Sequence, residues 1–98
     1  MSKFVIMTND GAGYENVFLA WSNDFGGYYT TVDYLDEVNE GSVCDTIAQA
    51  EDMARDADSG TFGGWQAPMI VVEVLNYDDV INNDDEPELK EVKVVELN

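Results

Sequence analysis

The chain has 98 residues, of which 45% are hydrophobic and 11% aromatic, and this is enough apolar material for the core of one small domain. It carries 21 Asp and Glu residues, four Lys and Arg residues and no His, so its formal net charge is −17. A surface this negative repels nucleic-acid phosphates and anionic membranes, and we expect neither as a direct partner.

Three short strands are expected in the first third of the chain. Residues 3–8 form an apolar run that ends at an Asn-Asp-Gly turn signal, and residues 17–21 form a second apolar run. Together they predict a hairpin with a long loop. Residues 28–34 (YYTTVDY) are rich in aromatic and β-branched side chains, which favour a half-buried strand.

One amphipathic helix is predicted after these strands. Ser42 is a suitable N-cap residue, and Asp45 stands three positions later, where a capping box places its acid. The pair Ser59-Gly60 marks the helix end. An apolar stripe at helical spacing should face the sheet, and it consists of Val43, Ile47, Ala50, Ala54 and Ala57.

Two further strands complete the predicted fold. Residues 69–75 (MIVVEVL) predict a well-buried strand, and residues 91–97 (EVKVVEL) predict a final one. Residues 76–90 between them are acidic and without a period, so they predict a loop. The order β-β-β-α-β-β indicates a single α+β domain over residues 1–98, with a mostly antiparallel sheet of four to five strands and one helix packed on one face.

The acidic residues of the predicted helix lie where an ordinary exposed face would mix in lysine. Asp45, Asp52 and Asp56 fall opposite the apolar stripe. Asp52 and Asp56 are like charges at i,i+4, and Asp56 and Asp58 lie near the helix C-terminus, where the helix dipole disfavours anions. A solvated polar face is the plain interpretation, but these local costs also indicate a function or an unusual solvent.

Two more segments, before and after the helix, are acidic with almost no lysine between the acids. Each alone would suit a solvated loop, but the three segments together predict a surface that binds a basic partner. The predicted partner-binding residues are Asp33, Asp36, Glu37, Glu40, Asp45, Asp52, Asp56, Asp58, Asp78, Asp79, Asp84, Asp85 and Glu86. Aromatic side chains near these acids are candidate anchors, namely Tyr28, Tyr34, Trp65 and Tyr77.

Patterns for catalysis or metal binding are weak. Without His, no Ser/His/Asp or Cys/His arrangement can form, and no glycine-rich phosphate motif occurs. Cys44, in the first predicted helical turn, is expected to be a buried, inert thiol. Residues 56–60 resemble the opening of a calcium loop but miss the later EF-hand positions, and residues 84–86 would bind divalent ions only weakly. We therefore expect no enzyme, no catalytic residue, no metal site and no cofactor.

The charge of the whole chain can be compared with that of DNA. Duplex DNA carries one phosphate charge per about 1.7 Å, so 21 carboxylates match roughly 36 Å of duplex. A globule of this length is about 30 to 35 Å across. In size, charge and α+β pattern the chain resembles the small phage-encoded DNA-mimic inhibitors of restriction enzymes and CRISPR nucleases. That class shares no fold or motif, so the resemblance lies in the charge profile and assigns no role to any residue.

The resemblance implies an inhibitor that occupies the basic groove of a DNA- or RNA-binding enzyme. Two alternatives remain open. One is an acidic partner, such as an antitoxin-like inhibitor, of a basic protein unrelated to nucleic acid. The other is a soluble domain adapted to high salt, although three of the four cations are Lys and Asn is abundant. With no long apolar segment and no signal-peptide pattern, a cytoplasmic location is expected.

Overall fold

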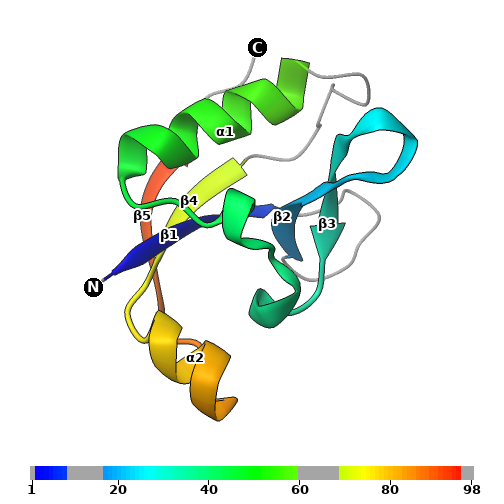
Figure 1. Ribbon diagram of the computed structural model, residues 1–98. Helices are drawn as coiled ribbons and strands as arrows, with labels where there is room; N and C mark the ends of the chain where they lie inside the picture. The colour runs from blue at the N-terminus through cyan, green and yellow to red at the C-terminus, as the bar shows by residue number, and fades with distance from the viewer. Residues whose placement is uncertain (1, 9–16, 60–68, 96–98) are drawn as a thin grey trace.

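The computed structural model describes residues 2–8, 17–59 and 69–95. Five strands form one antiparallel sheet in the order β3-β2-β1-β4-β5 (Figure 1). The strands are β1 (Lys3–Thr8), β2 (Val17–Ser22), β3 (Tyr28–Val32), β4 (Met69–Val74) and β5 (Leu89–Val95). Two α-helices accompany them, α1 (Ile47–Ser59) and α2 (Tyr77–Asn83). This architecture confirms the predicted α+β class. Neither helix in the described residues is long and apolar enough to cross a membrane.

Each face of the sheet carries a buried core cluster and a helix, whereas one helix on one face was predicted. Successive side chains of a strand point to opposite faces, so Val5 and Ile6 of β1 belong to different core clusters. The cluster of Ile6 packs against Ala50, Met53, Ala54 and Ala57 of α1. The cluster of Val5 packs against Leu35, Val38 and Val80. In Figure 1, α1 and α2 accordingly lie on opposite sides of the sheet. The molecule measures 35 × 28 × 27 Å, in agreement with the expected size.

Residues 39–44, which follow β3 in the chain, lie between β1 and β2 where these strands are not paired. In the described residues these two strands pair at only two positions. Near the start of β1, Phe4 and Cys44 exchange two backbone hydrogen bonds of 2.8 Å, which makes Cys44 a bridge partner of β1. On the β2 side, the Trp21 N–H donates to Ser42 Oγ at 2.9 Å, and Asn39 Nδ2 donates to the Trp21 carbonyl at 2.9 Å. The segment thus completes the sheet where the two strands diverge.

The buried hydroxyl of Ser42 gives a first prediction. Ser42 is fully buried, and its Oγ accepts the Trp21 N–H, for which Asn39 Oδ1 at 3.4 Å is a poorer acceptor. We expect Ser42→Ala to lower the free energy of unfolding by about 1 to 2 kcal/mol, measured by urea denaturation, because the partly buried Trp21 N–H loses its better acceptor. Ser22→Ala removes a half-buried hydroxyl at the end of β2 whose Oγ accepts the exposed Asp24 N–H at a longer 3.3 Å, and it should change this free energy by less than about 0.5 kcal/mol. Equal effects of the two substitutions would contradict this role of Ser42.

The predicted helix start at Ser42 is wrong. Ser42 lies in a short 3-10 turn, η3 (Glu40–Ser42), and Cys44 lies in the bridge to β1, so the helix cannot begin there. α1 begins at Ile47, after Thr46, whose Oγ1 accepts the Gln49 N–H at 3.1 Å. Cys44 is buried, as predicted, although not in a helical turn. Burial, and to a lesser degree Asp45, raises the pKa of its thiol, which disfavours the reactive thiolate.

The predicted loop over residues 76–90 is also wrong in part. It contains α2, which was missed, and the first residues of β5 (Leu89–Val95), which begins two residues earlier than predicted. The predicted end of this strand, at residue 97, lies outside the described residues. α2 has seven residues, and Val80 is its only buried residue. A single buried residue gives no period that a sequence could display.

Candidate functional site

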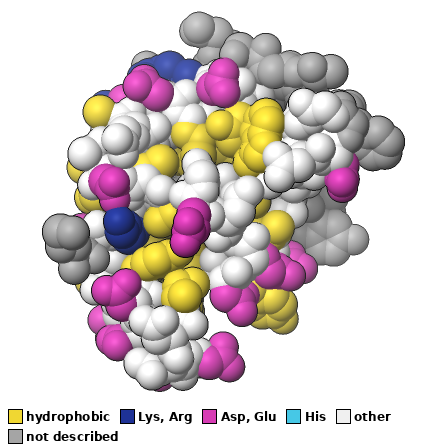
Figure 2. Space-filling model, in the orientation of Figure 1, with side chains coloured by type: hydrophobic (Ala, Val, Ile, Leu, Met, Phe, Trp, Pro, Cys, Tyr) yellow, Lys and Arg dark blue, Asp and Glu magenta, His cyan; other side chains and the backbone are white. Residues whose placement is uncertain are grey.

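A groove of about 490 Å³ opens on the α2 side of the sheet. Part of its lining is apolar or aromatic and comes from Phe18, Tyr34, Leu35, Val80 and Pro87. Six exposed carboxylate residues line it as well, and we therefore name it the acidic groove: Asp33, Asp36, Glu37, Asp84, Asp85 and Glu86. In Figure 2, Asp and Glu side chains gather in the lower part of the view, around α2 and the segment after β3.

The first wall of the acidic groove is the 3-10 turn η2 (Leu35–Glu37). Leu35 is 3% exposed and anchors this turn in the core. The Tyr34 N–H donates to the Glu37 carboxylate at 3.1 Å, and the Glu37 N–H donates to the Tyr34 carbonyl at 3.0 Å. These two bonds close the turn and leave the Tyr34 side chain 68% exposed beside the groove.

The second wall is the chain that leaves α2. Asp84 ends the helix in the left-handed conformation, with φ of +56°, and its N–H donates to the Asp79 carbonyl. The Asn76 side chain then holds the returning chain in two places. Its Nδ2 donates to the Glu86 carbonyl at 2.9 Å, and its Oδ1 accepts the Glu88 N–H at 2.7 Å. The acids of residues 84–86 are therefore fixed relative to the start of α2.

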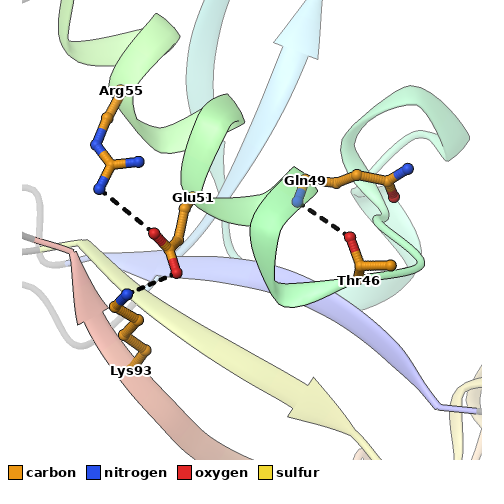
Figure 3. A network of polar contacts seen from close by, with 5 residues as sticks. All are labelled: Thr46, Gln49, Glu51, Arg55 and Lys93. Carbon is orange, nitrogen blue, oxygen red and sulfur yellow. Dashed lines mark hydrogen bonds and ion pairs between the residues drawn. The ribbon is translucent and has the colours of Figure 1, made fainter.

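The cationic side chains lie away from the acidic groove. Lys3 forms an ion pair with Asp45. Arg55 Nη2 and Lys93 Nζ both contact the Glu51 carboxylate, at 3.3 and 2.8 Å, and this links α1 to β5 (Figure 3). All four Lys and Arg residues of the chain are described, and none lines the acidic groove. The negative charge of the groove is thus not offset by a cationic side chain in its lining.

The ion pairs of Glu51 with Arg55 and Lys93 predict how the stability of the fold depends on pH. Hydrogen bonding to Lys93, with the charges of Lys93 and Arg55, lowers the pKa of Glu51 below its ordinary value. A lowered folded-state pKa stabilises the fold at pH above the ordinary glutamate pKa of about 4.3, and this contribution is lost as the pH falls through the folded-state value. Glu51→Gln should therefore lower the urea midpoint at pH 7 but not at about pH 2. Asp52→Asn, on the outer side of α1, should show no such loss at pH 7.

Nine of the thirteen predicted partner-binding residues lie on the α2 side of the sheet and form no ion pair with the described Lys and Arg residues. Six line the acidic groove, as described above. Asp78 and Asp79 lie in the first turn of α2, where the helix dipole favours acids. Stabilisation of this helix therefore explains their presence without a partner. Glu40 lies on η3 and lines a smaller hollow of about 280 Å³ with Tyr77 and the Lys3–Asp45 pair.

The other four predicted residues do not join the acidic groove. Asp45 is engaged by Lys3, and the remaining three belong to α1, which covers the opposite face. Asp52 is exposed and Asp58 is half-buried. Burial raises the pKa of Tyr29, and Asp56, which hydrogen-bonds to it, raises it further, so Asp56 also has a local partner. The single acidic surface expected from the sequence is therefore divided between the two sides of the sheet.

The predicted aromatic anchors are placed differently from one another. Tyr34 lines the acidic groove, Tyr77 is half-buried against the core, and Tyr28 lies on β3, the edge strand. Trp65 lies outside the described residues. Sequence reasoning missed Trp21, which is 38% exposed, and also the Glu51 ion pairs, although Glu51 and Arg55 stand at the i,i+4 spacing of a helical ion pair.

Among the described residues, no three Asp, Glu or Cys side chains are placed so that they could hold a metal ion. The carboxylates of the acidic groove are thus distributed along its walls and do not converge on one point. Comparison of the chain with protein-family models, curated proteins and solved structures found no match.

Proposed function

We propose that this protein is a nucleic-acid mimic that binds the basic groove of a DNA- or RNA-binding enzyme and blocks it. Restriction enzymes and CRISPR nucleases are the first targets to test, since the charge profile of the chain resembles that of their small phage-encoded inhibitors. The observation that carries the proposal is the acidic groove, where six carboxylates from two distant segments come together without a Lys or Arg side chain. Opposite potentials of this kind accelerate encounter and select for a basic partner.

The number of carboxylates on the α2 side indicates the length of duplex DNA whose charge it can match. At one charge per about 1.7 Å of duplex, the six groove carboxylates match about 10 Å of DNA, and the nine predicted acids of the α2 side that form no ion pair match about 15 Å. A helical turn of DNA is about 34 Å long. The α2 side therefore supplies the charge of nearly half a turn, which suits occupation of one basic groove rather than imitation of a long duplex.

The two alternatives are separable from this proposal. High-salt adaptation requires negative charge but not a groove free of Lys and Arg. Circular dichroism in low salt distinguishes high-salt adaptation from mimicry, because a halophilic domain unfolds in low salt and a mimic stays folded. An acidic inhibitor of a basic protein unrelated to nucleic acid has the same electrostatics, and it is distinguished by whether duplex DNA competes for the partner.

The decisive experiment is competition with DNA. We expect the protein to inhibit cleavage by at least one member of a panel of purified restriction and CRISPR nucleases, with inhibition weakening as salt or duplex concentration rises. Immobilised protein should also retain nucleic-acid-binding proteins from a bacterial lysate and release them when duplex DNA is added. Retained proteins that resist duplex DNA, together with no inhibition across the panel, would contradict the proposal.

Such a function requires no catalytic group and no cofactor of this chain. It also implies a location in the cytoplasm of a bacterial cell, where nucleases of this kind meet their DNA. The protein itself should not bind nucleic acid, and a gel shift with duplex DNA tests this directly.

A further inference from the structure

The acidic groove has two chemically different parts. Its floor includes Phe18, Leu35 and Val80, which are at most 6% exposed and belong to the core cluster on this side of the sheet. Its rim carries six carboxylates on the two walls. The ring of Tyr34, 68% exposed, stands on the rim between Asp33 and Leu35 in the chain. An occupant must therefore offer positive charge to the rim and apolar or weakly hydrated surface to the floor.

Arginine meets both requirements better than lysine. The guanidinium group is planar, presents a fork of donors that matches a carboxylate as it matches a phosphate, and stacks on aromatic rings. It is also more weakly hydrated than an ammonium group, so contact with an apolar floor costs it less. The lysine ammonium is a compact and strongly hydrated charge, and it gains little from Tyr34 or from the floor.

We propose that the acidic groove receives arginine side chains of the basic partner in preference to lysine, with the guanidinium held by the rim carboxylates and stacked on Tyr34. This inference rests on the proposed function in so far as the arginine belongs to a nucleic-acid-binding surface. It adds the chemical class of the side chain and the residue that selects it. The acids of α1 lie on the other face and contribute only long-range attraction to such a partner.

Two capped pentapeptides of equal charge serve as probes, one with two arginines and the other with two lysines, each separated by glycine. In an NMR titration of the full chain, we expect the arginine peptide to bind about three- to fivefold more tightly. Its chemical-shift changes should be largest for the amides of residues 33–37 and 84–86. Equal affinities of the two peptides, or shift changes centred on α1, would overturn the proposal.

Tyr34 provides a matched pair of variants. Tyr34→Ala removes the ring from an exposed position and keeps the backbone hydrogen bonds of η2, so the fold should persist. It should abolish the preference for arginine, whereas Tyr34→Phe should retain it. An unchanged preference in Tyr34→Ala would disprove the role of the ring. If nucleases are inhibited but no arginine preference is found, this inference fails alone. If arginine is preferred but no nuclease is inhibited and the retained proteins resist duplex DNA, the proposed function fails alone.

Discussion

Neutralising four acids of the acidic groove should weaken binding of the basic partner by about 100-fold. The variant carries the substitutions Asp33→Asn, Asp36→Asn, Asp84→Asn and Asp85→Asn, two on each wall of the groove. At about 0.7 kcal/mol for each exposed ion pair lost, the four changes together correspond to two orders of magnitude. The inhibition constant for a nuclease, or the dissociation constant of a partner that duplex DNA displaces, measures this effect.

The four asparagines should leave the fold intact. All four acids are exposed, and asparagine tolerates the left-handed conformation of residue 84 as well as aspartate does. Glu37 is left unchanged because its carboxylate accepts the Tyr34 N–H and closes η2. Since like charges on the two walls repel each other, we expect the free energy of unfolding to rise slightly in this variant, which separates a binding defect from a folding defect.

A second variant with the same total charge provides the control. Asp24→Asn, Asp52→Asn, Asp58→Asn and Glu91→Gln also remove four charges from the formal net charge of −17, but none of these residues lines the acidic groove. We expect it to slow association modestly and to weaken binding by less than about threefold. If both variants weakened binding equally, net charge rather than the acidic groove would govern recognition.

The sequence predicted the elements whose pattern is local. β1 agrees with the prediction at both ends, and β4 agrees at its start and ends one residue earlier, because long runs of β-branched and other apolar side chains mark a buried strand. The end of α1 at Ser59 was also predicted. Its start was not, because Ser42 and Thr46 are both acceptable N-cap residues. The choice between them is made by the backbone bridge from Cys44 to Phe4, which is a tertiary contact.

The acidic segments were predicted, but not which of them come together. Residues 33–37 follow β3 and residues 84–86 follow α2, and β3 lies three positions from β4 in the sheet. Repulsion between their carboxylates opposes this arrangement. Burial of Leu35, Val38 and Val80 in one core cluster supports it, at about 1.5 to 3 kcal/mol for each side chain. Sequence composition reports the charges, whereas these three apolar residues decide their position.

The largest effect on stability outside the core is expected at Gly27. This residue has φ of +103° and ψ of 130°, a conformation essentially restricted to glycine. A Cβ atom there would also lie 2.3 Å from Cζ2 of Trp21, whose ring meets Tyr29 edge to face at a centroid distance of 4.9 Å. Backbone strain and displacement of the Trp21 ring therefore act together.

Gly27→Ala should lower the free energy of unfolding by about 2 to 3 kcal/mol, which is a large share of the stability of a domain this small. The near-ultraviolet circular dichroism should change as well, because the Trp21–Tyr29 contact is disturbed. Gly41→Ala is the matched control, since Gly41 has no positive φ and a Cβ there meets no atom within 4 Å. It should change stability by less than about 0.5 kcal/mol. A Gly27→Ala protein as stable as the Gly41→Ala protein would mean that neither the backbone conformation at Gly27 nor the position of the Trp21 ring constrains the fold, and the close approach of these two residues would then have no energetic role.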